Sequence, residues 1–257
     1  MGFVPTMGAL HEGHLSLVRH AHAECDVVVA SIFVNPLQFA PGEDFARYPR
    51  TFEEDCRMLE AEGVDVLFAP ATAEMYPEGA VTTVIVAGIG DRLDGASRPG
   101  HFTGVATVVA KLFHLVNPDR AYFGQKDAAQ LAVLRQMVRD LNFDVELVGC
   151  PIVRDEDGLA LSSRNKYLSA REREDALVLH AALLRMEEMI AQGERQSVTL
   201  VRSGMEILQA VAGVRVDYLV IVDANSLQPV TTAAKGLLVA VAAYVGETRL
   251  IDNFLVP

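Results

Sequence analysis

Two histidines, His11 and His14, stand three residues apart in the segment Pro5–His14, which follows a short apolar run at the start of the chain. At the start of a helix, residues three apart lie on one face, and the unpaired backbone N–H groups there bind anions. A zinc site of the H-E-x-x-H type requires a spacing of four, so this metal motif is not matched. The pair predicts a phosphate site, although two surface histidines on a polar helix start would produce the same pattern.

Two further polar segments follow apolar runs. Gln38 comes shortly after the run Asp26–Val34, and its neutral amide can donate to a carboxylate and accept from a hydroxyl group. An amide that caps a loop is the alternative. Lys126, in the segment Tyr122–Gln130, offers a point charge for phosphate, and Asp127 is a candidate helix cap. A solvated helix start explains these two residues almost as well, and the P-loop pattern is absent.

A fourth polar segment, Asp157–Asn165, contains Ser162, Ser163 and Arg164. Two hydroxyl groups and a guanidinium can hold phosphoryl oxygens and stabilise their charge, and a polar turn between domains is the alternative. The glycine-containing stretch Gly88–Leu93 does not match the dinucleotide fingerprint, because leucine occupies the third glycine position. Together the polar segments predict a site for a nucleoside triphosphate.

The elements that must position these residues alternate between apolar runs and amphipathic segments. Strands are expected at Gly2–Pro5, Asp26–Val34, Val64–Ala69, Thr82–Val86, Arg120–Phe123 and Asp144–Val148. Such β-α-β alternation predicts an α/β fold, with a doubly wound, mostly parallel sheet that binds ligands at the carboxyl ends of its strands. Thr51 and Glu54 have the spacing of a capping box, and Gly63 stands where a helix C-terminal glycine belongs.

The pattern changes after Pro151, and it predicts a second, α+β domain. Ser169 and Glu172 form a capping-box pattern that opens a helix ending near Gln192, where Gly193 can terminate it. A second helix is expected at Val198–Val211, followed by antiparallel strands at Val216–Asp223, Gly236–Val245 and Thr248–Asp252.

Composition limits the classes of function. The 22 Lys and Arg against 34 Asp and Glu give a net charge of −12, which disfavours nucleic acid and anionic membranes as partners. The three cysteines have no C-x-x-C spacing, so neither a disulfide framework nor a thiolate metal site is expected. The sequence has no transmembrane run or signal peptide pattern, and it predicts a cytoplasmic protein.

Six ordered motifs resemble those of the AMP-forming pantoate–β-alanine ligase family, the pantothenate synthetases. They are Gly2–His14, Phe33–Phe39, His101–Thr107, Tyr122–Gln130, Leu161–Asn165 and Arg249–Asn253. The resemblance implies a Rossmann-like ATP- and pantoate-binding domain of the nucleotidylyltransferase superfamily at 1–153, a smaller C-terminal α+β lid domain at 154–257, and a homodimer. It also implies ATP as co-substrate, bound with Mg²⁺, and pantoate and β-alanine as substrates.

The resemblance also implies roles for individual residues. His14 takes the place of the catalytic acid. His11, Lys126 and Arg164 are the other implied catalytic residues. The implied ATP contacts are Met7, Gly8, His11, His14, Gly124, Gln125, Lys126, Asp127, Val153, Leu161, Ser162, Ser163 and Arg164. Gln38, Gln130, Arg98 and His101 are the implied substrate contacts, and no protein ligand is assigned to a metal.

Two departures from the family pattern bear on these roles. Gln125 stands where many relatives have Glu. Relatives also carry further residues before the first strand, so Met1 is either the native start or follows a missing segment. Two other functions remain open: a nucleotidylyltransferase that transfers AMP to a phosphorylated acceptor, and a silent nucleotide-binding protein. The amides of Gln38 and Gln130 favour a small hydroxy acid, because a phosphorylated acceptor would require more Arg and Lys.

Overall fold

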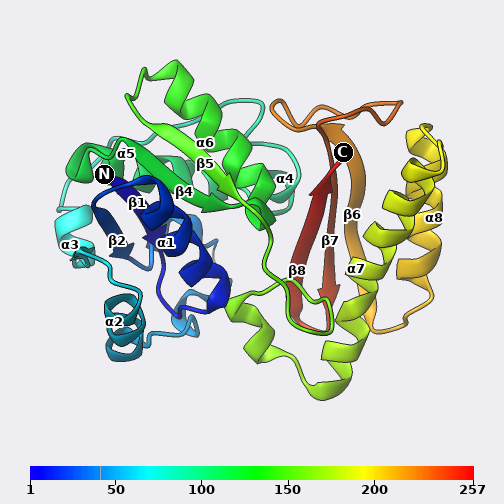
Figure 1. Ribbon diagram of the computed structural model, residues 1–257, viewed down its shortest axis with the longest axis horizontal. Coiled ribbons are helices and arrows are strands. Elements are labelled where there is room, and N and C mark those ends of the chain that lie inside the picture. Colours follow the sequence, from blue (N-terminus) through cyan, green and yellow to red (C-terminus); the bar gives the residue numbers. More distant parts are fainter. Residues whose placement is uncertain (41) are drawn as a thin grey trace. The chain divides into compact units, whose positions relative to one another are not determined.

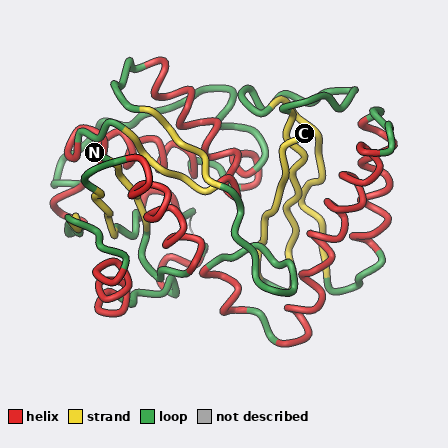
Figure 2. Tube along the Cα trace, in the orientation of Figure 1, coloured by secondary structure: helices red, strands yellow, loops and turns green. Residues whose placement is uncertain are grey.

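A computed structural model describes residues 1–40 and 42–257, which form two compact units (Figures 1 and 2). The first unit contains Met1–Gln125 and Ala129–Pro151. The second contains Lys126–Ala128 and Ile152–Pro257. The main division of the chain therefore falls after Pro151, and a short segment around Lys126 groups with the C-terminal part.

The first unit is built on a parallel five-stranded sheet. Its strands are β1 (Gly2–Thr6), β2 (Val28–Ile32), β3 (Val66–Phe68), β4 (Arg120–Gly124) and β5 (Glu146–Cys150), in the order β3-β2-β1-β4-β5. All of the strand pairs are parallel, which confirms the expected doubly wound α/β class. The strand order reverses between β1 and β4, and such a switch point is where open α/β sheets bind ligands.

In the part of the chain that the structure describes, the first unit also contains six α-helices, of which α1 and α5 make the most contacts with the sheet. They are α1 (Glu12–Glu24), α2 (Phe52–Ala61), α3 (Thr72–Met75), α4 (Asp94–Ser97), α5 (His101–Val116) and α6 (Ala128–Asp140), the last beginning at the Lys126–Ala128 segment of the second unit. Leu17 and Val18 of α1 join Val4 and Tyr122 of the sheet in one buried cluster. Burial of this apolar face fixes α1 on β1 and β4, and so fixes the position of its first turn.

Two expectations for the first unit were wrong. Thr82–Val86 is not a strand: the backbone N–H of Val84 donates to Oγ1 of Thr107 rather than to a neighbouring strand. β-branched composition favours a pleated, half-buried surface, and this segment has no such partner among residues 1–40 and 42–257.

The Thr51–Glu54 capping box is also not formed. Thr51 occupies the N-cap position of α2, but its hydroxyl donates to the carboxylate of Asp55 at 3.2 Å and not to the helix backbone. The carboxylate of Asp55, in the first turn of α2, thus binds the hydroxyl group that would otherwise cap the helix backbone. Gly63, with φ of +80°, does terminate α2 as expected.

The second unit packs two helices against a three-stranded antiparallel sheet, which confirms the α+β class of this part. The helices are α7 (Ala170–Ala191) and α8 (Ser197–Gln209), and the strands are β6 (Val214–Asp223), β7 (Leu237–Val245) and β8 (Thr248–Leu255), in the order β6-β7-β8. The capping box at Ser169 and Glu172 is present, and Gly193 follows the end of α7 with φ of +101°. Among the helices that the structure describes, none has the combined length and apolar character needed to cross a membrane.

Candidate active site

The loop between β1 and α1 is held by a buried carboxylate from α2. Asp55 is 1% exposed, and its two oxygens accept the backbone N–H groups of Ala9 at 2.9 Å and Leu10 at 2.8 Å. Gly8 precedes them with φ of +74°, a conformation that favours glycine. Sequence reasoning missed Asp55; the only signal was a carboxylate in the first turn of a helix. Asp55 thereby fixes the backbone that leads to His11.

The histidine pair forms the start of α1. His11 is the N-cap residue, and its Nδ1 accepts the N–H of Gly13 at 3.2 Å. The Nδ1 of His14 accepts the N–H of His11 at 3.3 Å, and the two ring centroids lie 4.1 Å apart. Because each Nδ1 accepts a hydrogen bond, each neutral ring carries its proton on Nε2. The two rings thus add N–H donors to the positive end of a helix.

The amide of Gln38 is oriented by two neighbours that sequence reasoning missed. The N–H of Leu37 and the hydroxyl of Tyr76 both donate to Oδ1 of Asn35, at 3.2 and 2.8 Å. The amide nitrogen of Asn35 therefore faces Oε1 of Gln38, at 3.1 Å. Gln38 is 9% exposed, and its Nε2 lies 3.0 Å from the sulfur of Met7. Gln38 thus turns its NH₂ group toward the segment that follows β1. Asn35 carried a signal, since Asn before Pro is typical of a helix cap.

Tyr76 is fixed as a hydrogen-bond donor in this arrangement. Burial raises the pKa of its hydroxyl to about 12. The phenol therefore stays protonated at neutral pH and keeps its hydrogen bond to Asn35.

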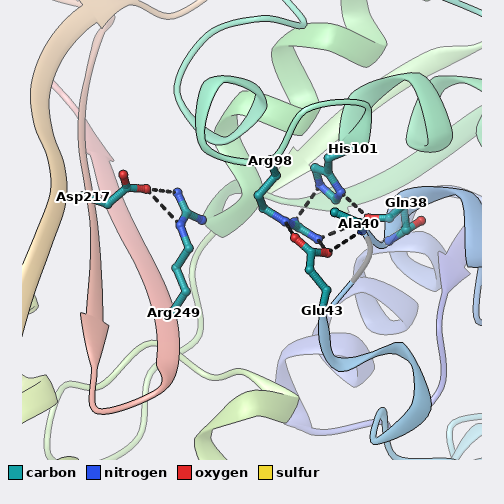
Figure 3. Close-up of polar contacts among 7 residues, drawn as sticks. All are labelled: Gln38, Ala40, Glu43, Arg98, His101, Asp217 and Arg249. Atoms are coloured by element: carbon teal, nitrogen blue, oxygen red, sulfur yellow. Dashed lines mark hydrogen bonds and ion pairs between the residues drawn. The ribbon is translucent and has the colours of Figure 1, made fainter.

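Arg98, His101 and Glu43 form one polar network around the backbone of Gln38 (Figure 3). Arg98 donates to both carboxylate oxygens of Glu43 at 2.7 Å. Although burial opposes it, the hydrogen bonds and charge of Arg98 hold the pKa of Glu43 below its usual range. Arg98 also donates to Nε2 of His101 at 3.0 Å, so Nδ1 of this ring carries the proton and donates to the carbonyl oxygen of Gln38 at 2.8 Å.

This network predicts a pH effect on stability. Burial, with the charge of Arg98, lowers the pKa of His101 to about 4, from 6.5 in the unfolded chain. Between these values the unfolded state binds more protons, so the free energy of unfolding is expected to fall as pH drops below 6.5, by about 2 kcal/mol at pH 5. Urea unfolding at pH 7.5 and 5 should show this loss in the wild type, with a smaller loss in His101→Gln. An equal loss in both proteins would contradict it.

The site residues near the end of β4 lie on a turn. Gly124 ends the strand, and a 3₁₀ turn, Gln125–Asp127, leads into α6. The ammonium group of Lys126 lies 4.0 Å from the carboxylate of Asp127. The backbone carbonyl of Lys126 accepts a hydrogen bond of 2.8 Å from the side chain of Asn253. Gln130 is half-buried in the first turn of α6.

In the second unit, the structure brings together the two ends of a hairpin. The N–H of Leu161 donates to the carbonyl of Val153 at 3.0 Å, and Arg154 pairs with Ala160 in an antiparallel bridge. Ser162 then caps a 3₁₀ helix, Ser163–Tyr167, by accepting the N–H of Arg164 at 3.3 Å. Val153 and Leu161–Arg164 therefore belong to one local structure, although the sequence separates them.

The candidate residues are divided between the two units. The first contains Met7, Gly8, His11, His14, Gln38, Arg98, His101, Gly124, Gln125 and Gln130, and the second contains Lys126, Asp127, Val153, Leu161, Ser162, Ser163 and Arg164. Within the first unit, the histidine pair follows β1 and Gly124 ends β4, so these residues flank the switch point of the sheet.

A cavity of about 270 Å³ lies in the first unit beside Met7 and Gly8. Its walls come from segments that follow β1, β2 and β3, and they include the side chains of Asp55 and Thr72. In the described ranges 1–40 and 42–257, no cluster of three or more His, Cys, Asp or Glu side chains could hold a metal ion. The chemistry that these side chains offer is hydrogen bonding and stabilisation of negative charge.

The chain is similar to known proteins along nearly its whole length. The model of the family described as pantoate-beta-alanine ligase matches residues 1–255. The pantothenate synthetases of Acidobacterium capsulatum and Koribacter versatilis are 65% and 59% identical to the chain; each alignment covers 99% of the chain, and 85% and 88% of the respective relative.

Solved structures show the same likeness. Pantothenate synthetase from Thermus thermophilus matches with a TM-score of 0.96 and 56% identity, over 99% of this chain and 92% of that one. The pantoate-beta-alanine ligase from Francisella tularensis, complexed with beta-gamma ATP and beta-alanine, matches with a TM-score of 0.78 and 37% identity, over 99% and 88%. These matches confirm the resemblance drawn from the motifs: the chain belongs to the pantoate–β-alanine ligase family.

Proposed function

We propose that this protein condenses pantoate with β-alanine to form pantothenate, with ATP converted to AMP and pyrophosphate. The observation that carries the proposal is the histidine pair at the start of α1, which adds two Nε2–H donors to the helix N-terminus at the switch point of the sheet. The ATP and β-alanine in the related ligase from Francisella tularensis support the same substrates.

The chemistry requires activation because a carboxylate is a poor acylating agent. An oxygen of the pantoate carboxylate attacks the α-phosphorus of ATP, the bond to the β-phosphate oxygen breaks, and pyrophosphate leaves. The amine of β-alanine then attacks the acyl carbon of the pantoyl adenylate, AMP leaves with the bonding electrons, and the nitrogen loses a proton. No covalent bond to the protein is formed, so its residues act by positioning and by stabilising charge.

The side chains divide this work. His11, His14, Lys126 and Arg164 stabilise negative charge on the phosphates. Gln38 and Gln130 orient pantoate. The hydrogen bond from Asn35 to Oε1 leaves the NH₂ group of Gln38 as the donor to a substrate oxygen, which suits a carboxylate or hydroxyl group.

The adenylate route predicts where ATP is cleaved. With all three substrates present, the nucleotide products should be AMP and pyrophosphate. Labelled pyrophosphate should exchange into ATP when pantoate is present, without β-alanine, because the first step is reversible and precedes amine attack. Formation of ADP and phosphate would contradict the adenylate route, and exchange without pantoate would indicate a different acceptor.

Four finer statements belong to the same proposal. ATP enters as its Mg²⁺ complex, in which water and phosphate oxygens supply most ligands. The second unit acts as a lid that shields the acyl adenylate from water. The protein works in the cytoplasm, where its three free cysteines stay reduced, and its negative charge disfavours nucleic acid as a partner.

A homodimer is also part of this proposal, and residues 80–87 support it. In this apolar stretch, Val81 is 92% and Ile85 68% exposed. A β-type sequence that finds no strand partner in the described chain fits pairing with a second copy.

The homodimer predicts a sedimentation result. Sedimentation of the full chain should show a dimer, and Ile85→Asp should shift it toward the monomer. Leu184→Asp, at an exposed site on α7, is the control; a monomeric wild type or a dimeric Ile85→Asp protein would contradict the proposal.

A further inference from the structure

We propose that Asp252 and Asn253, adjacent on β8, are positioning residues for ATP. They fix the positions of two segments of the second unit relative to each other. These segments are the hairpin that carries Val153 and Leu161 and the backbone of Lys126, and the proposed ATP contacts lie on both. The inference rests on the proposed function and extends it to residues of the Arg249–Asn253 motif.

Asp252 anchors the hairpin through Arg154. Its side chain is 4% exposed, and its two oxygens accept both terminal nitrogens of Arg154, at 2.7 and 2.9 Å. Arg154 also donates to the carbonyl of Gly158 at 3.1 Å, across the turn of the hairpin. One guanidinium therefore joins the hairpin turn to β8. The paired ends of this hairpin are Val153 and Leu161.

The hairpin turn is also held from α7. Arg173 forms ion pairs with Asp155 at 2.6 Å and with Asp157 at 2.8 Å. These groups are about one-third exposed, so water screens them more than it screens the buried carboxylate of Asp252. Asp252 is the anchor least accessible to water, and we expect it to contribute most to the hairpin's position.

Asn253 anchors Lys126. It is 3% exposed, and its Nδ2 donates to the carbonyl oxygen of Lys126 at 2.8 Å. Neighbouring residues on a strand point to opposite faces, so Asp252 and Asn253 hold their two segments from the two faces of β8. The strand itself is fixed by its register with β7, where Asp252 pairs with Val241 and Asn253 with Ala240.

This arrangement has a consequence for nucleotide binding. Lys126 is separated from the hairpin by more than two dozen residues of chain, yet both are attached to two consecutive residues of one strand. Phosphate contacts depend on sub-ångström placement, and a shift of about 1 Å can lower a rate 10²-fold. A fixed distance between the Lys126 backbone and the hairpin would prearrange the phosphate contacts before ATP binds.

The test measures the Kd of ATP by titration calorimetry on the full chain, a readout that does not require turnover. Asn253→Asp keeps the size of the side chain but replaces the donor to Lys126 by an oxygen and adds a negative charge, and it should raise the Kd by at least about tenfold, because the loss of one buried hydrogen bond alone has about this effect. Asp252→Asn, also isosteric, removes the charge that holds Arg154, and it should raise the Kd several-fold. It keeps the proposal testable if Asn253→Asp does not fold.

The matched control is Asp217→Asn. Asp217 of β6 forms an ion pair with Arg249 of β8 at 2.8 Å (Figure 3), so this pair joins two strands of the same sheet. This variant should lower the thermal midpoint and leave the Kd of ATP within twofold of the wild type. With steady-state assays, Asn253→Asp should raise KM for ATP and leave KM for pantoate unchanged.

The outcomes separate the two proposals. Equal rises in Kd for Asn253→Asp and Asp217→Asn, or an unchanged Kd in the two β8 variants, would overturn the positioning role. A wild type that binds ATP but shows no pantoate-dependent exchange would overturn the proposed reaction instead, and the calorimetric comparison would still decide on Asp252 and Asn253.

Discussion

Replacing His14 by alanine is expected to lower the rate of pantoyl adenylate formation by about 10²- to 10³-fold, the usual effect of removing one preorganised donor from a charge-stabilising site. The Nδ1 of His14 is occupied by the N–H of His11, which fixes the ring and places its proton on Nε2. The rate should be measured as pantoate-dependent exchange of pyrophosphate into ATP.

His20→Ala is the matched control for this prediction. His20 lies on the same helix, is exposed, and contacts the carbonyl of Ser16 at 2.7 Å. Its replacement should leave the exchange rate within about twofold of the wild type, because it lies two turns from the helix N-terminus, where the dipole effect is lost. Near wild-type exchange in His14→Ala, with unchanged thermal stability, would assign His14 a capping role only.

Replacing Asp55 by alanine is expected to lower the free energy of unfolding by about 2–6 kcal/mol, since each of two buried N–H groups left without a partner costs about 1–3 kcal/mol. These groups belong to Ala9 and Leu10. The same change should reduce pyrophosphate exchange, because the loop that leads to His11 loses its anchor. Urea unfolding followed by circular dichroism measures the first effect.

Two variants sharpen the test of Asp55. Asp55→Asn keeps one acceptor oxygen and should show an intermediate loss of stability. Glu54→Ala removes an exposed carboxylate from the same turn of α2 and should change the free energy of unfolding by no more than about 0.5 kcal/mol. If Asp55→Ala and Glu54→Ala are equally stable, the carboxylate of Asp55 does not hold the loop.

The order of the strands and helices could be predicted because it depends on local patterns. Apolar runs bounded by turn residues predicted β1 and β4, and a serine followed three residues later by glutamate predicted the start of α7. Prediction failed where a side chain found a hydrogen-bond partner other than the one that the local pattern indicated. Thr51 had the spacing of a cap, but its hydroxyl bonds the carboxylate of Asp55.

The sequence by itself determined the family, the α/β order and the residue types at the site, because periodicity, caps and motif spacing are properties of neighbouring residues. Tertiary structure alone decided which side chains hold those residues in place. Asp55 reaches Ala9 across 46 positions, Tyr76 reaches Asn35 across 41, and Arg154 reaches Asp252 across 98. Such contacts form only when sheet register and helix packing have fixed the backbones, and a buried polar group then bonds whichever partner lies within about 3 Å.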